Sequence, residues 1–185
     1  PPDRLAAYLG ELRALLRDQG LRGVTYGHFG EGCIHLRVGF GLDRAGGPER
    51  LEAFMSAAAD LVVRHGGSLS GEHGDGRARS ELLSIIYSPQ VLAAFARFKA
   101  VFDPEGLCNP GVLVDPAPLD VALRPQAAPV DMEARLAHAW PDDGGSYVKA
   151  VRRCVGVGLC RTQTGAMCPS YQVTRDEVAS TRGRA

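Results

Sequence analysis

Three histidines and one glutamate stand in two glycine-rich segments of the chain. His28 and His35 lie seven residues apart in a segment with three glycines, at positions 27, 30 and 32, so a hairpin there can bring both imidazoles to one point. Glu72 and His73 are adjacent in the segment Ser-Gly-Glu-His-Gly-Asp-Gly. Two neutral imidazoles and a carboxylate can hold a divalent metal that polarises a hydroxyl or carboxylate, which leaves His73 as a base. The sequence therefore predicts a metal site at His28, His35 and Glu72, for Zn, Mn or Fe.

Each histidine taken alone also fits a structural role, in which a turn imidazole bonds to a backbone carbonyl. The combination of two histidines with a Glu-His pair favours the metal site. An inert α+β domain, whose histidines bind nothing, is the alternative, and metal content would separate the two.

The elements that must position these groups follow from the apolar pattern. Helical stripes, two of them opened by a proline, run through residues 3–18, 49–64, 79–87 and 89–102. Strands are expected at residues 24–26 and 34–38, and a short strand with a loop at residues 68–76. We predict an α+β fold, an antiparallel sheet flanked by helices, with the first helix packed across the sheet.

Composition limits the class of protein. The chain has 185 residues, and its 21 Lys and Arg balance its 21 Asp and Glu, so no net charge attracts a nucleic acid. No apolar run approaches the roughly 20 residues that cross a bilayer, and the Pro-Pro-Asp start lacks signal-peptide features. We predict a cytoplasmic protein with no transmembrane segment and no nucleic-acid partner; peripheral association with the inner membrane is left open.

Proline crowding divides the chain. Pro116, Pro118 and Pro125 favour an extended connection over packed structure. We therefore expect a first domain at residues 1–115, a Pro/Gly-rich linker at 116–146 and a small irregular or helical cysteine-containing region at 147–185. A short helix is predicted within the linker region, at residues 132–140.

Five cysteines are an odd number in a chain without an export signal, which argues against a disulfide framework. Cys154, Cys160 and Cys168 resemble a bacterial ferredoxin motif in which Val157 stands in place of the middle cysteine. Three thiolates cannot complete a 4Fe-4S cluster, so the site is unfinished in these residues unless another ligand lies downstream or in a partner. Three reduced thiols without a metal are the alternative.

Three motifs carry a resemblance to a known family. Residues 27–35 are similar to a Gly-His-x-Gly-Asp-Gly-Asn-x-His segment, with Glu31 in place of Asp and Cys33 in place of Asn. The Glu-His-Gly segment at residues 72–74 is intact, and residues 102–111, Phe-Asp-Pro-Glu-Gly-Leu-Cys-Asn-Pro-Gly, resemble the closing segment. Residues 1 to about 115 thus look like the C-terminal domain of FAD-linked oxidases, the family of D-lactate dehydrogenase, glycolate oxidase and D-2-hydroxyglutarate dehydrogenase.

The resemblance implies roles for particular residues. His28, His35 and Glu72 would ligate the ion that orients a 2-hydroxy acid, and Glu72 and His73 would lie on the flavin side, with His73 as the base. Asn109 would be a cofactor contact. Taken alone, the segment 102–111 that contains Asn109 also fits a plain helix stop followed by a turn. Arg37 could bind a substrate carboxylate or lie on an exposed strand face.

The cysteine region resembles the iron-sulfur module fused behind such flavin domains. We therefore predict the C-terminal part of an FAD-dependent 2-hydroxy-acid dehydrogenase of D-lactate or glycolate type, passing electrons to an acceptor through an iron-sulfur domain. FAD is expected to be bound mainly by a domain absent from these residues, and a homodimer is left open. The alternative is a flavin-free metal-binding or electron-transfer subunit of a larger oxidoreductase.

Overall fold

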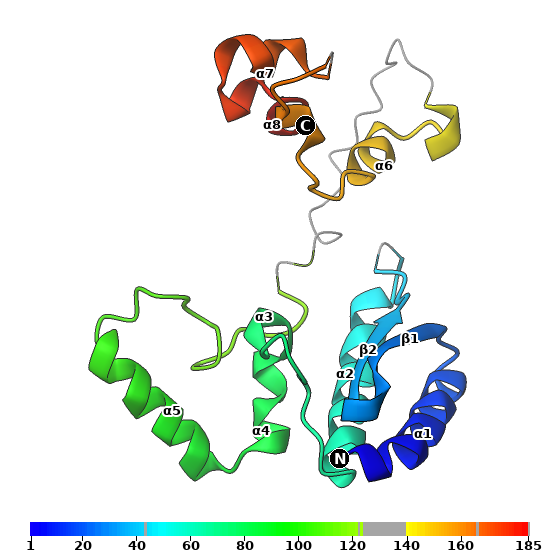
Figure 1. Ribbon diagram of the computed structural model, residues 1–185, viewed down its shortest axis with the longest axis vertical. Helices are drawn as coiled ribbons and strands as arrows, with labels where there is room; N and C mark the ends of the chain where they lie inside the picture. Colours follow the sequence, from blue (N-terminus) through cyan, green and yellow to red (C-terminus); the bar gives the residue numbers. More distant parts are fainter. Residues whose placement is uncertain (43, 122, 124–139, 166, 185) are drawn as a thin grey trace. The chain divides into compact units, whose positions relative to one another are not determined.

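The computed structural model describes residues 1–42, 44–121, 123, 140–165 and 167–184 (Figure 1). The chain forms two compact units, Pro1–Ala127 and Ala128–Ala185, and each is described by itself. The elements of the first unit are, in chain order, η1 (Pro2–Arg4), α1 (Leu5–Asp18), β1 (Gly23–His28), η2 (Phe29–Glu31), β2 (Cys33–Val38), α2 (Gly47–Arg64), α3 (Gly76–Arg79), η3 (Ser80–Leu82), α4 (Leu83–Ile86) and α5 (Pro89–Phe102).

The two strands form an antiparallel hairpin whose faces differ in chemistry. Tyr26 lies opposite His35 and His28 lies opposite Cys33. Because side chains alternate along a strand, these residues share one face and Leu36 points to the other. The mixed helix and strand fold with an antiparallel sheet confirms the predicted class.

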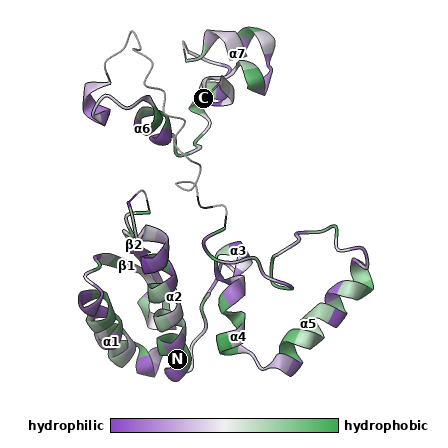
Figure 2. Cartoon of the chain, turned by 180° about the vertical axis from the view of Figure 1, so that it is seen from behind, coloured by the Kyte–Doolittle hydropathy of each residue, from purple (hydrophilic) through white to green (hydrophobic). Residues whose placement is uncertain are grey.

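The core lies where the apolar face of the hairpin meets α1 and α2. Its buried side chains come from both helices, and the strand β2 adds two partly buried ones: Leu12, Leu16, Phe54 and Leu61, with Leu36 and Val38. Figure 2 shows hydrophobic residues along these two helices. The first helix therefore packs against the sheet as predicted, because its leucine stripe repeats at helical spacing.

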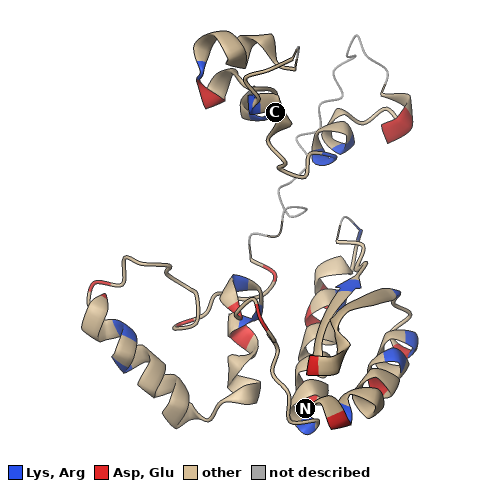
Figure 3. Cartoon of the chain, in the orientation of Figure 1, with Lys and Arg blue, Asp and Glu red and all other residues tan. Residues whose placement is uncertain are grey.

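Local signals explain where the long helices begin. Pro48 stands in the first turn of α2, where a missing backbone N–H is tolerated. Ser88 caps α5, and its hydroxyl accepts from the Val91 N–H at 3.4 Å. No residue of α5 is buried, and Phe98 and Phe102 are exposed, on a helix with few charged residues (Figure 3).

Of two predictions about the segment between α2 and α5, the strand is wrong and the helix is confirmed only in part. Residues 68–75 contain no strand, and the segment ends at Gly74 and Gly76, whose positive φ values of 70° and 52° do not fit an extended strand. The helix expected at residues 79–87 is three short helical turns that begin at Gly76. Ser80 breaks the run: its hydroxyl bonds to the Gly76 carbonyl and accepts the Leu113 N–H at 2.9 Å, which competes with helical bonding.

The second unit is built from short helical turns. Its described elements are η5 (Pro141–Asp143), α6 (Tyr147–Arg152), η6 (Leu159–Arg161), α7 (Pro169–Thr174), η7 (Glu177–Ala179) and α8 (Thr181–Arg184). Of the helix predicted at residues 132–140, residues 132–139 lie outside the described residues. Residues 119 and 121, in the predicted linker, belong to the first unit and bond to its helical turns: Glu81 accepts the Leu119 N–H at 2.6 Å and Arg77 donates to the Val121 carbonyl at 3.0 Å.

A polar contact joins α1 to the end of α2. Glu11 lies 3.0 Å from His65 Nε2 and 3.4 Å from Arg64 Nη2. Hydrogen bonds from His65 and, to a smaller extent, Arg64 lower the pKa of Glu11. Tyr8 packs edge-on against the His65 ring at 5.7 Å, and burial raises its pKa.

We predict that Glu11→Gln removes a pH-dependent part of the stability. Because the folded-state pKa of Glu11 lies below the ordinary value of 4.5, its contribution is present above about pH 4.5 and is lost as the pH falls through the folded pKa. Thermal unfolding should show the variant less stable at neutral pH and equal to the wild type in acid. Glu52→Gln, the same change on the exposed side of α2, is the control, and an equal effect of both variants would contradict the prediction.

Candidate metal and substrate site

The hairpin presents two imidazoles next to its turn. His28 ends β1, and His35 lies on β2 on the same face. The turn closes through Gly32, which takes a φ of 74°. Gly27 has a φ of 141°, and a Cβ there would lie 2.5 Å from the Cys33 carbonyl oxygen and 3.3 Å from His35 Cδ2. Glycine is therefore required beside the histidine pair.

The loop between α2 and α3 brings Glu72 and His73 to that face. A Cβ on Gly71 would lie 2.6 Å from Cys33 Sγ, so the loop backbone runs directly against β2. Arg79 Nη1 donates to the Gly74 carbonyl at 3.3 Å and holds the loop after His73. The loop path is thus determined by close backbone approach and by a side-chain hydrogen bond.

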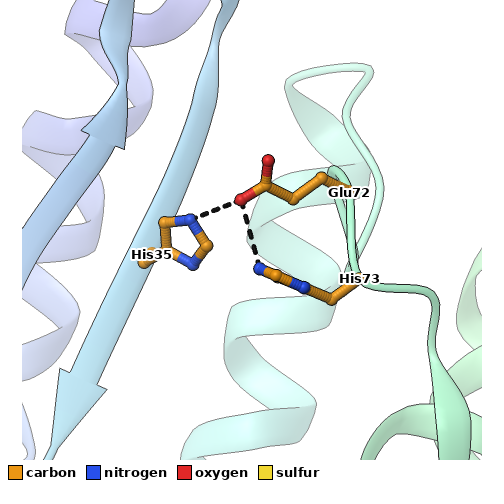
Figure 4. A group of neighbouring side chains, drawn as sticks. All are labelled: His35, Glu72 and His73. Carbon is orange, nitrogen blue, oxygen red and sulfur yellow. Dashed lines mark ion pairs between the residues drawn. The ribbon is translucent and has the colours of Figure 1, made fainter.

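The Glu72 carboxylate lies among the three imidazoles. Oε1 is 2.6 Å from His35 Nε2 and 3.2 Å from His73 Nε2, and Oε2 is 3.8 Å from His28 Nε2 (Figure 4 shows the first two contacts). The tightest group is His35, Glu72 and His73, whose ligand atoms lie within 4.8 Å of one another. The structure thus brings the four predicted residues together, with His73 closer to the carboxylate than His28.

These groups fit a divalent ion. Two ligands on a tetrahedral zinc lie about 3.3 Å apart, from bonds of about 2.0–2.1 Å, and the three separations at Glu72 bracket that value. Ligation through Nε2 of a neutral His35 leaves its proton on Nδ1, so ion binding would select one tautomer of the imidazole.

Aromatic and cationic side chains extend the site along the hairpin. The Tyr26 ring stacks on the His35 ring with centroids 4.8 Å apart and planes 14° from parallel. The Arg37 guanidinium lies 5.5 Å from the Tyr26 ring centroid, a cation–π arrangement. Arg37 follows His35 by two strand positions, about 6.6 Å, on the same exposed face. The contact of Tyr26 with His35 was not predicted from the sequence. Period-two alternation along the strand from His28 would have placed Tyr26 on this face.

Asn109 lies in a turn fixed by the end of α5. Asp103 accepts the Leu107 N–H at 2.8 Å and the Cys108 N–H at 3.0 Å. Lys99 Nζ contacts Asp103 and donates to the Cys108 carbonyl at 2.8 Å. The hydrogen bond from Lys99 is the largest of the causes that lower the pKa of Asp103. Asn109 is exposed with a positive φ of 45°. The turn therefore presents the Asn109 side chain at the surface from a backbone fixed by hydrogen bonds.

The remaining predicted site residues belong to the second unit. No disulfide links any of the five cysteines, all of which are described. Within the described residues, Cys154, Cys160 and Cys168 do not form a group of sulfurs close enough for a single ion. A donor set made only of thiolates nevertheless suits an iron-sulfur cluster, whose irons take separate sulfurs, and it is one ligand short.

Comparison with known proteins identifies the family of the chain. The fold and site define a mixed helix and strand domain that presents histidines and a glutamate beside a short antiparallel sheet. Residues 1–113 match the family model described as FAD linked oxidases, C-terminal domain. The chain belongs to this family.

Relatives match beyond that domain. The chain is 32% identical over 187 residues to D-2-hydroxyglutarate dehydrogenase of Haemophilus influenzae and 34% identical over 193 residues to that of Escherichia coli. Each alignment covers all of this chain and 18% of the relative. D-lactate dehydrogenase of Archaeoglobus fulgidus is 32% identical over 114 residues, 62% of this chain and 25% of the relative. The chain thus spans under a fifth of the first two relatives. In the described residues, no helix has the length and apolar character needed to span a bilayer.

We predict that Gly27→Ala lowers the free energy of unfolding by more than about 1 kcal/mol, because alanine resists the positive φ and meets the Cys33 carbonyl. Urea unfolding followed by circular dichroism measures this. Gly30→Ala is the matched control, since a Cβ there meets no atom within 4 Å, and it should change stability by less than about 0.5 kcal/mol. Equal stability of the two variants would show that the hairpin is not so closely packed.

Proposed function

We propose that the protein acts as an FAD-dependent dehydrogenase that oxidises a 2-hydroxy acid to the 2-oxo acid, with this chain supplying the metal and substrate site. The observation that carries the proposal is the Glu72 carboxylate within reach of three imidazoles in a domain of the FAD-linked oxidase family. Four relatives that match along the whole chain are named D-2-hydroxyglutarate dehydrogenase, so this acid is the first substrate to test, before D-lactate and glycolate.

The residues of the chain bind and orient the substrate. His28, His35 and Glu72 would hold a divalent ion, which would bind the hydroxyl and carboxylate of the substrate. Arg37, exposed on the same face, binds a substrate carboxylate through its planar fork. A bound divalent ion supplies Lewis-acid polarisation of the hydroxyl, and bound FAD supplies the hydride acceptor.

His73 takes the hydroxyl proton. Its side chain is 69% exposed, so it is accessible to a substrate beside the carboxylate. A neutral imidazole has one ring nitrogen with a lone pair, and this nitrogen of His73 is the atom that accepts the proton. Loss of this proton and of hydride from the α-carbon gives the 2-oxo acid. Asn109 would contact the bound flavin, and Glu72 and His73 would lie on the flavin side of the site.

The second unit provides the path for electrons. Cys154, Cys160 and Cys168 would hold a 4Fe-4S cluster together with a ligand from outside these three, and the cluster would supply one-electron transfer to an acceptor. This part of the proposal is supported by the thiolate donor set and by relatives that match the chain through this unit.

We predict that Glu72→Gln reduces metal affinity by more than about 100-fold, because loss of a direct ligand exceeds the 10–100-fold effect typical of outer-shell residues. Metal content of the full-length protein, prepared without chelators, is measured by plasma mass spectrometry. The wild type should hold about one divalent ion per site. Glu31→Gln, in the adjacent hairpin turn, is the control and should retain the ion. A folded wild type without metal would favour the inert domain.

We predict that Arg37→Lys and Arg37→Ala lower kcat/KM for the 2-hydroxy acid, by about tenfold to 100-fold for Ala, since a charged hydrogen bond contributes about 1.5–3 kcal/mol. Lysine keeps the charge but not the bidentate fork, so it should fall between wild type and Ala. Metal content must be unchanged in both. Unaltered kinetics would place Arg37 on a solvent-exposed strand face without a role in binding.

A further inference from the structure

A charged cluster in the second unit has no role in the reaction proposed above. Glu177 accepts from Arg161 Nη1 at 2.8 Å. Glu177 Oε1 also accepts from Arg182, whose Nε lies at 2.9 Å and whose Nη2 contacts the same oxygen. Two guanidinium groups around one carboxylate leave a net positive charge. Arg161 directly follows Cys160 in η6, so this charge lies beside a predicted ligand.

The segment after Glu177 also contacts Cys168. The Cys168 sulfur lies 3.9 Å from the Ser170 hydroxyl and 3.7 Å from the Ala179 carbonyl, and Ser170 donates to the same carbonyl at 3.0 Å. Ser180 is fully buried, with 0% exposure, and its hydroxyl accepts the Gly183 N–H at 3.0 Å. The backbone beside the thiol is therefore fixed by hydrogen bonds.

Electrostatics relate this segment to all three cysteines. Hydrogen bonds, first from the Thr181 side chain and then from the Tyr171 backbone, lower the pKa of Cys168 to about 7. Glu177 is the main cause that raises the pKa of Arg182, and Cys160 and Cys154 contribute less.

We propose that residues 179–182, with Arg182 held by Glu177, form the cationic wall of an iron-sulfur site at Cys154, Cys160 and Cys168 and raise its reduction potential. The inference rests on the cysteine site of the proposed function. A cluster gains negative charge when it is reduced, so a fixed cation favours the reduced form. Hydrogen bonds to the sulfurs act in the same direction, since both are known determinants of cluster potential. Arg182 is a positioning and tuning residue here, not a ligand.

The test compares charge-removing and charge-keeping variants in the full-length protein. Wild type, Arg182→Gln and Arg182→Lys are reconstituted anaerobically with ferrous iron and sulfide, and iron, sulfide and the cluster midpoint potential are measured. Arg182→Gln should make reduction less favourable by about tenfold in the equilibrium constant, about 59 mV for one electron. Arg182→Lys should remain near the wild type. Arg175→Gln, at the end of α7, is the matched control for loss of one arginine.

The outcomes separate this inference from the function on which it rests. A lowered potential in Arg182→Gln alone, with iron content and circular dichroism unchanged, supports the cationic wall. Equal potentials in all variants overturn it and leave the cluster in place. Loss of iron from both Arg182 variants, with the fold retained, also overturns it, because the residue would then be needed for assembly and not for potential. A wild type that binds no iron overturns both the cluster and the wall.

Discussion

The site of the first unit depends on a carboxylate that belongs to no helix or strand. Glu72 lies in the loop before α3, and its contact with His35 at 2.6 Å joins that loop to the sheet. Leu69 is the one large apolar side chain of residues 68–75, so burial contributes little to the path of the loop. Polar contacts and the approach of Gly71 to Cys33 determine where the carboxylate lies. An ion at this position would therefore stabilise the loop as well as bind substrate.

Because side chains alternate along the strands, one face of the hairpin packs in the core and the other carries the residues of the candidate site. Leu36 packs against the core, while His35 and Arg37 point to the other face. A slip of one residue in the strand pairing would reverse these faces, placing an imidazole in the core. Two-stranded sheets are marginal by themselves, so the pairing depends on the packing of α1 and α2. The close approach at Gly27 restricts the register further.

Patterns with a strong period were predictable, and local geometry was not. The leucine stripe of α1 and the prolines at the starts of α2 and α5 predicted these helices to within a few residues. The helix expected at residues 79–87 is interrupted because Ser80 bonds to the backbone and to a distant segment, a contact that no periodicity encodes. The four site residues were identifiable from their types and glycine neighbours. Which imidazole lies nearest to Glu72 depends on the conformation of the loop. Because glycines allow many backbone conformations, the sequence does not determine this order.

The second unit lacks the feature that stabilises the first. No apolar side chain in its described residues is buried, and Val155, Val173 and Val178 are largely exposed. The hydrophobic effect therefore contributes little there, and the ion pairs around Glu177 and the bonds around Ser180 determine its arrangement. Exposed ion pairs contribute only about 0–1 kcal/mol each. Small units without a sufficient core commonly depend on a metal or another cross-link, and three cysteines near one positively charged segment are the groups in this unit that could provide it. The same ligation would then carry electrons and hold the unit together, which is why its folding and its redox chemistry are expected to be linked.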